Sequence, residues 1–331
     1  MTYVQTFLLY TLSPPPTGRL GLGYIDSGHD TLRVSFDLDG TDEPQMTCEQ
    51  VDRIADSKPR SKASKGRRKK PPTAAQYIEG HPSNDQVSVL IHQNSTSLQS
   101  TTGDTGSVIW RSSSRLAACL IRQMHKRRDD GCCLLNLKGT SSLNVLELGS
   151  GTGVLPVLLL SYLSRLPYGP QLYWTATDQG NLLPLLNRNL AGIPTSAKIT
   201  VSARQLNWIA CSTEYHAGAS YAGGLDGLRR SILDQGPSNT SSSVDLLIAV
   251  DCVYNPSLFS PLMDTIDTFT TPNHTIVLVF IELRSSDATM QFLQTWLDRP
   301  QGDQWRIWTV PHDQLSCGLD KGYAAWVAWR E

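Results

Sequence analysis

A glycine-rich segment, VLELGSGTG at residues 145–153, is the feature that most restricts how this chain of 331 residues can fold. It follows a β-rich run and precedes the apolar run VLPVLLLSYL, which is typical of a buried helix. Gly149, Gly151 and Gly153 let the backbone turn tightly and come close to a ligand, which side chains would prevent. The segment therefore predicts a strand, a tight turn that binds a ligand, and a helix.

The details of this turn distinguish two classes of ligand. Dinucleotide-binding enzymes use the pattern GxGxxG/A, which would need Gly or Ala at position 154, and the residue there is Val154. Glu147, two residues before the first glycine, is characteristic of methyltransferases. A carboxylate at that position can help to orient the cationic methionine end of S-adenosylmethionine through the loop, whereas it would repel a pyrophosphate. The turn thus favours S-adenosylmethionine over a dinucleotide.

Strand-like and helical patterns alternate after this point. A helix is expected from Ser112, and the β-rich runs lie at 143–148, 171–177, 198–206, 244–250 and 275–283. Such alternation implies a parallel sheet with helices on both faces. Two more β-rich runs, 305–310 and 323–330, have no helix between them and suit an antiparallel hairpin at the sheet edge. We expect an α/β fold, a Rossmann-like doubly wound seven-stranded sheet with this C-terminal hairpin and a small N-terminal β element.

Two polar stretches interrupt the pattern. Residues 209–243 are rich in Gly and Ser and are expected to form a loop insertion between the third and fourth strands. Apolar residues also thin out over about 41–83, where residues 58–70 contain eight Lys or Arg among thirteen residues. Such a stretch buries too little surface to offset its ordering entropy, so we expect a disordered insertion. It also suits nuclear import or contact with ribosomal RNA.

The domain organisation follows from these boundaries. Residues 1–110 are expected to form an N-terminal β element around the basic insertion, with strands near 4–10, 32–38 and 87–93. Residues 111–331 are expected to form the S-adenosylmethionine-dependent methyltransferase domain. The N-terminal element is interpreted as a cap on that domain.

Composition restricts the class of protein. A formal net charge of −1 argues against a surface built throughout to neutralise phosphate. The seven cysteines are odd in number and have no CxxC spacing, so a disulfide framework and a metal site are not expected. The N-terminus has no basic region of the kind found in signal peptides, and no apolar run is long enough to span a bilayer. We expect a protein of the cytoplasm, or of the nucleus, without a membrane segment or a metal.

Three residues outside the glycine turn are candidates for cofactor binding. Asp178 ends the second strand, where a carboxylate can bind both ribose hydroxyls of an adenosine; its alternative role is a turn former or helix cap. Trp208 follows the third strand, where its ring can stack on adenine, and Trp110 precedes the first helix. Both tryptophans have the alternative of ordinary packing.

The fourth strand ends in AVDCVYNP, which places Asp251 at the carboxyl edge of the sheet beside the glycine turn. Asp251 and Tyr254 can face a reaction pocket together, or they can be a strand-end cap and a packed tyrosine. Asn255 followed by Pro256 is interpreted as a helix N-cap with proline at the first helical position.

These motifs resemble a known family. ELGSGTG, Asp178, Trp208 and above all the Asp-x-x-Tyr of Asp251 and Tyr254 resemble the family 16 seven-strand protein lysine methyltransferases. TGSVIW, DCVYN and IELRSSD are similar to the fungal ribosomal lysine N-methyltransferase 5 branch of that family. The resemblance extends from about residue 87 to the C-terminus. The glycine motif is shared by the whole superfamily of such methyltransferases. Asp-x-x-Tyr together with ELRSSD restricts the resemblance to this family.

The resemblance implies a lysine methyltransferase that acts on a large-subunit ribosomal protein with S-adenosylmethionine as cofactor. Asp251 and Tyr254 would face the acceptor. The cofactor site would be lined, in addition to Glu147 behind the turn, by Trp110, Gly149, Ser150, Gly151, Asp178, Trp208 and Val250. The basic insertion at 58–70 is not part of the family pattern.

Asp251 would orient a lysine amine that must lose its proton before it attacks the methyl group. Glu282 and Arg284 can shape the acceptor entrance or form an ion pair at the strand end. Two alternatives stay open: an RNA or small-molecule methyltransferase of the same fold, and a catalytically silent ribosome-binding module. Cys252 is adjacent to Asp251, but its side chain is expected to point away from Asp251 into the sheet.

Overall fold

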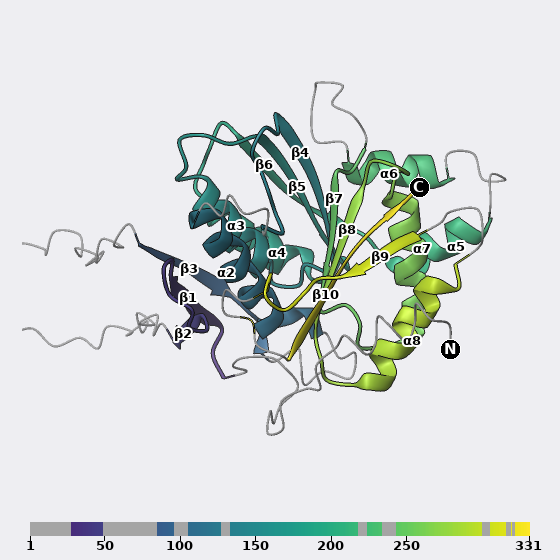
Figure 1. Cartoon of the computed structure of the whole chain (residues 1–331), viewed down its shortest axis with the longest axis horizontal. Helices are drawn as coiled ribbons and strands as arrows, with labels where there is room; N and C mark the ends of the chain where they lie inside the picture. The colour runs from purple at the N-terminus through teal and green to yellow at the C-terminus, as the bar shows by residue number, and fades with distance from the viewer. Residues whose placement is uncertain are drawn as a thin grey trace, which may run out of the picture.

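The computed structural model describes residues 28–48, 85–95, 105–126, 133–217, 224–233, 243–299, 305–315, 319 and 322–331. These residues form a large mixed sheet with helices on both of its faces, and a small second sheet beside the helices of one face (Figure 1).

The large sheet has seven strands in the order β6-β5-β4-β7-β8-β10-β9. The first five strands in this order are parallel to one another, whereas β10 is antiparallel to both β8 and β9. The bounds are β4 Ser142–Leu148, β5 Gln171–Asp178, β6 Ile199–Gln205, β7 Leu246–Val250, β8 Ile276–Glu282, β9 Trp305–Thr309 and β10 Tyr323–Arg330. The expected doubly wound sheet with a C-terminal antiparallel hairpin is therefore confirmed.

Helices cover the two faces of this sheet. One face carries α2 Arg111–His125, α3 Val154–Leu163 and α4 Leu183–Leu190. The other carries α5 Trp208–Ala217, α6 Gly224–Leu233, α7 Phe259–Phe269 and α8 Ser286–Leu297. Because α3 packs between the large sheet and the small one, nearly all of its residues are buried, which explains its largely apolar sequence.

The small sheet has the order β2-β1-β3, with β1 Thr31–Asp37, β2 Gln45–Cys48 and β3 Gln86–His92, all antiparallel neighbours. Alternate residues of β1, such as Val34 and Phe36, are buried in the same core cluster as α2 and α3. The expected strands near 32–38 and 87–93 are confirmed, and the one near 4–10 lies outside the described residues. The third strand is β2, inside the range expected to be disordered, because its backbone pairs with β1 and Met46 packs against the core. Residues 49–83 of that range lie outside the described residues.

The expected loop insertion at 209–243 is wrong, because α5 and α6 occupy most of it. Helical spacing is present in α6, where Leu225, Leu228 and Ile232 recur on one face and Ile232 is buried. The Gly and Ser residues around the two helices obscured this spacing.

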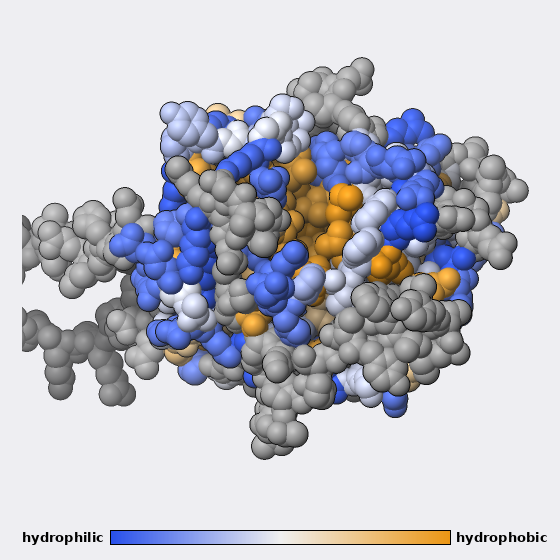
Figure 2. All heavy atoms as spheres, in the orientation of Figure 1, coloured by the Kyte–Doolittle hydropathy of each residue, from blue (hydrophilic) through white to orange (hydrophobic). Residues whose placement is uncertain are grey.

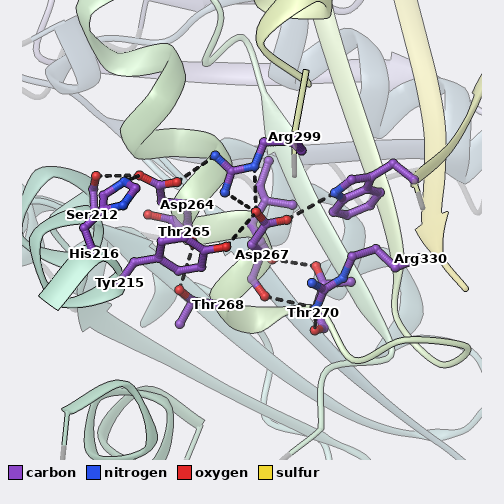
Figure 3. A network of polar contacts seen from close by, with 12 residues as sticks. Ser212, Tyr215, His216, Asp264, Thr265, Asp267, Thr268, Thr270, Arg299 and Arg330 are labelled. Atoms are coloured by element: carbon purple, nitrogen blue, oxygen red, sulfur yellow. Dashed lines mark hydrogen bonds and ion pairs between the residues drawn. The ribbon is translucent and has the colours of Figure 1, made fainter. Parts of the chain in front are cut away.

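A buried ionic network ties the second face together (Figure 3). The Arg299 guanidinium pairs with Asp264 and Asp267, which lie one turn apart on α7. Asp267 also accepts a hydrogen bond from Trp305 Nε1 at 3.1 Å, and Asp264 accepts one from Ser212 Oγ at 2.6 Å. The network thereby joins α5, α7, the end of α8 and β9. It holds in place the helix whose first residue is Trp208.

Figure 2 shows the surface in the orientation of Figure 1, with apolar side chains gathered in the middle of the view, over β7 and β8, between hydrophilic flanks. Ile276 at the start of β8 is among the exposed apolar residues. In the part of the chain that the structure describes, no helix is both long and apolar enough to cross a membrane.

Candidate active site

A cavity of about 1000 Å³ opens at the carboxyl edge of the large sheet. It lies where β4 and β7 are neighbours and the chain leaves them toward opposite faces, the usual ligand position in open α/β sheets. The short helix η2, Thr105–Ser107, and the residues up to Trp110 form a further wall. The lining includes all the expected site residues except Glu147, namely Trp110, Gly149, Ser150, Gly151, Asp178, Trp208, Val250, Asp251 and Tyr254.

The glycine turn has the backbone that only glycine adopts readily. Gly149, Gly151 and Gly153 have φ values of 65°, 53° and 74°. A Cβ atom on Gly151 would lie 2.9 Å from the carbonyl oxygen of Gly106, and one on Gly149 would lie 2.9 Å from Cys252 Sγ. The turn therefore packs so closely against η2 and the end of β7 that a side chain would have no room.

Asp178 lies at the end of β5 and contacts this turn directly. Its Oδ2 atom accepts a hydrogen bond of 2.7 Å from the Gly151 amide, and Oδ1 accepts one of 2.7 Å from the Gln179 amide. The carboxylate thus holds the turn while it also lines the cavity. It is in a position to bind hydroxyl groups of a ligand that rests on the turn.

Glu147 lies beneath the turn and outside the cavity lining. Only 2% of its surface is exposed, and its carboxyl accepts a hydrogen bond of 3.1 Å from Trp174 Nε1. Burial raises its pKa to about 7, so its charge changes near neutral pH. Any effect of Glu147 on a ligand therefore passes through the turn.

Two tryptophans flank the cavity. Trp208 is the first residue of α5, is half-buried, and lies 3.2 Å from the position that a Cβ on Gly149 would take. Trp110 precedes α2, and its Nε1 donates a hydrogen bond of 2.7 Å to the Thr105 carbonyl. Val250, the last residue of β7, is nearly buried in the wall. Aromatic and apolar surface is thus available to a planar ligand near the turn.

Asp251 follows β7 in the left-handed region, with φ 59°. Its amide donates a hydrogen bond of 2.7 Å to the Phe280 carbonyl. Its Oδ2 atom accepts a hydrogen bond of 2.9 Å from Ser112 Oγ and forms an ion pair with Arg284. Burial raises the pKa of Asp251, while Arg284 and Ser112 act in the opposite direction. The carboxylate is therefore fixed and poorly hydrated, and Asp251 is among the residues that line the cavity.

Tyr254 stands at the cavity mouth, with 46% of its surface exposed. Its hydroxyl accepts a hydrogen bond of 3.3 Å from Thr105 Oγ1. Asn255 is an N-cap, as expected, and accepts a hydrogen bond of 3.1 Å from the Ser257 amide at the start of the short helix η4, Pro256–Leu258. Asp251 and Tyr254 thus line one cavity together.

Glu282 and Arg284 form the ion pair anticipated as one of their two roles, at 3.2 Å, and both line the cavity. Arg111 pairs with the same carboxylate at 3.1 Å. Sequence reasoning gave Arg111 and Ser112 no role in the site. No local pattern marks them, because each contacts a partner more than 130 residues away along the chain.

Cys252 has its thiol directed into the sheet, where Sγ donates a hydrogen bond of 3.3 Å to the Leu148 carbonyl. Burial raises the pKa of this thiol well above its ordinary value. It is therefore a protonated, weakly nucleophilic group. Among the residues that the structure describes, no cluster of His, Cys, Asp and Glu could hold a metal ion.

Comparison with known proteins identifies relatives of this chain. A family model described as lysine methyltransferase matches residues 91–218 and 233–298, more than half of the chain. Ribosomal lysine N-methyltransferase 5 of Kluyveromyces lactis is 25% identical over 244 residues, which cover 64% of this chain and 72% of that protein.

Solved structures also align with the chain. The human methyltransferase-like protein 13 in complex with SAH aligns over 63% of this chain and 82% of its own, with 14% identity and a TM-score of 0.33. The CurJ carbon methyltransferase aligns over 70% of this chain, with 15% identity and a TM-score of 0.36, and the chain spans only 56% of its length.

Proposed function

The chain belongs to the lysine methyltransferase family of S-adenosylmethionine-dependent enzymes, and on that premise we propose that it methylates a lysine of a large-subunit ribosomal protein. The observation that carries the proposal is that the glycine turn and Asp251 line the same cavity. A methyl donor on the turn and an acceptor amine beside the carboxylate would therefore share one space. In-line transfer of a methyl group needs this juxtaposition.

The residues of the cavity fit S-adenosylmethionine. The glycine turn leaves open the space that side chains would fill, Asp178 offers a carboxylate for ribose hydroxyls, and Trp208 offers a ring for adenine. When bound, this cofactor supplies a methyl group on a positively charged sulfur. We propose that Trp110, Gly149, Ser150, Gly151, Asp178, Trp208 and Val250 hold it, with Glu147 acting through the turn.

Asp251 and Tyr254 are proposed to handle the acceptor. A lysine amine has a reference pKa of about 10.4 and must lose its proton before attack. The carboxylate of Asp251 can pair with the lysine ammonium as it enters, and can orient the amine by accepting a hydrogen bond once the proton has passed to solvent. Burial of the lysine lowers its pKa and so assists this loss of the proton. Tyr254 at the mouth, with the 58% exposed Ile209, offers apolar surface to the polypeptide around the lysine.

The ribosomal acceptor is proposed from the name of the Kluyveromyces lactis relative. We further propose that the protein works in the cytoplasm and also enters the nucleus. The basic residues 58–70, outside the described residues, would then supply contact with ribosomal RNA.

The test is to incubate the purified chain with isolated large ribosomal subunits and labelled S-adenosylmethionine, and to locate the label by mass spectrometry. Acid hydrolysis should release methyl-lysine from one ribosomal protein. Methylated nucleosides or methyl-arginine would reject the lysine acceptor. Binding of the cofactor without transfer to any acceptor would favour a silent binding module.

Asp251→Ala separates the two halves of the site. We expect cofactor affinity to change by less than about threefold, while turnover falls by about 100-fold, because the carboxylate acts on the acceptor. Calorimetry measures the first quantity and label incorporation the second. Equal losses of affinity and turnover would place Asp251 in the cofactor site instead.

A further inference from the structure

Arg284 occupies an unusual place in the cavity wall. Its guanidinium lies over the ring of Trp110, with 4.9 Å between Cζ and the ring centroid, and pairs with Asp251 and Glu282. The two carboxylates are almost completely buried, with 6% and 4% of their side chains exposed, whereas 26% of the Arg284 side chain is exposed. The arginine therefore reaches inward from solvent to two carboxylates that the strand ends hold in place.

This environment is that of a binding site for an organic cation. An aromatic face attracts a positive charge, and a fixed carboxylate beside it supplies an ion pair. A lysine ammonium would find the same two contacts there. Trp110, Asp251 and Arg284 line the cavity that also contains the glycine turn. In the structure, the cation over Trp110 and beside Asp251 is the guanidinium of Arg284, a residue of the chain itself.

The balance of charge indicates that one cation must leave before another enters. Among the ion pairs of the described residues, two carboxylates, Asp251 and Glu282, face two guanidiniums, Arg111 and Arg284. A third cation added to this set would be repelled and would have no carboxylate to itself. Arg284 can swing away from Asp251 and stay paired with Glu282, since residues 283–285 between β8 and α8 form no helix or strand.

We infer that the position of the Arg284 guanidinium, over Trp110 and beside Asp251, is the binding position of the acceptor's lysine ammonium, and that Arg284 vacates it when the acceptor binds. The inference rests on the proposed lysine acceptor. Arg284 then determines specificity by competing with the acceptor, because only a side chain that forms an ion pair can replace it. The apparent affinity for the acceptor is lowered by the fraction of molecules in which Arg284 occupies the site.

The first test measures binding without activity. The full chain, as wild type and as Arg284→Ala, is titrated with n-butylammonium and ethylguanidinium chloride, and tryptophan fluorescence is recorded. If the site is closed in about nine of ten molecules, Arg284→Ala should bind both cations about tenfold more tightly than the wild type does. Adding Asp251→Asn to Arg284→Ala should abolish the gain.

Arg111→Ala is the matched control. Arg111 pairs with the same Glu282, at 3.1 Å, and is 28% exposed, but it does not line the cavity. Its removal takes the same charge from the cluster but leaves the position over Trp110 occupied by Arg284, so it should increase the affinity for either cation much less than Arg284→Ala does. An equal gain in both variants, or none in Arg284→Ala, would overturn the inference.

The second test is kinetic. Arg284→Ala should lower the KM for the ribosomal acceptor about tenfold and leave cofactor affinity unchanged, whereas a purely structural role would lower the affinity for both. If Arg284→Ala does not fold, Arg284→Lys should give a smaller fall in KM, because one ammonium group cannot bridge both carboxylates as a guanidinium does. An unchanged or higher KM would refute the displacement.

The proposed function and the proposed role of Arg284 can fail separately. If the wild-type chain methylates no lysine, the proposed function fails, and the cation titration alone decides whether the site exists. If the wild type methylates lysine and Arg284→Ala binds neither cation more tightly, only the inference about Arg284 fails.

Discussion

At the scale of single residues, Gly151 shows how one missing side chain makes a site. Gly151→Ala would place a Cβ atom 2.9 Å from the Gly106 carbonyl oxygen in a left-handed conformation. Gly139→Ala is the matched control, since Gly139 has a φ of 75° and no atom of the described residues lies within 4 Å of the added Cβ. Both should lose about 1–2 kcal/mol of unfolding free energy from backbone strain, but only Gly151→Ala should also lose cofactor affinity. Urea unfolding and calorimetry measure the two, and equal affinities in the two variants would contradict the close packing at Gly151.

Glu147 leads to a prediction of pH dependence at the same scale. Its pKa is about 7 in the folded chain and about 4.5 in the unfolded chain. Between these values the unfolded chain releases the proton that the folded chain keeps, so stability should fall as pH rises from about 4.5 to about 7 and then level off.

Glu147→Gln keeps an acceptor for Trp174 and removes the ionisation. At pH 8 it should be more stable than the wild type by on the order of 3 kcal/mol, with almost no difference at pH 4. Unfolding by urea at several pH values checks this. Parallel stability curves for the two proteins would show that Glu147 does not titrate in this range.

At the scale of secondary-structure elements, the buried network around Arg299 decides how α5, α7 and α8 are held (Figure 3). Arg299→Gln would leave Asp264 and Asp267 without the guanidinium they share, and should cost about 3–5 kcal/mol of unfolding free energy. Arg306→Gln is the comparison, because Arg306 pairs with Glu331 at 2.7 Å where both are about half exposed. Its loss of stability should be far smaller, because solvent screens an exposed ion pair. Thermal unfolding distinguishes the two, and similar losses would mean that burial does not strengthen the network.

At the scale of the whole molecule, the core needs β2 and β3, and we expect it to form without residues 49–84, which connect these two strands. Cys48 pairs with Leu32 and Gln86 with Asp37, so the ends to be joined lie at opposite ends of β1, about 20 Å apart. Replacing 49–84 by a Gly/Ser linker of about 12 residues should preserve the melting temperature and cofactor affinity.

The same variant tests the basic residues 58–70. It should bind ribosomal RNA more weakly than the intact chain at low salt, and the difference should shrink as salt is raised. A large fall in melting temperature would instead assign the segment a structural role.

Much of this protein could be predicted from the sequence because the relevant signals are local. The alternation of strands and helices predicted the doubly wound sheet. The glycine turn at 145–153 and the residues at strand ends predicted the edge of the sheet at which Asp178 and Asp251 lie. Periodicity and turn chemistry act over a few residues, so one chain is enough to detect them. The helices α5 and α6 and the strand β2 were missed, because polar residues around them hid short patterns.

Only the tertiary structure decided which side chains surround each charge. Ser112 and Arg284 meet at Asp251 from positions 139 and 33 residues away, and Trp110 lies against Arg284. It also decided that Glu147 lies beneath the turn rather than in the cavity, and therefore titrates near neutral pH. The physical reason is that desolvation and ion pairing depend on distances through space, and those distances exist only once the elements have packed.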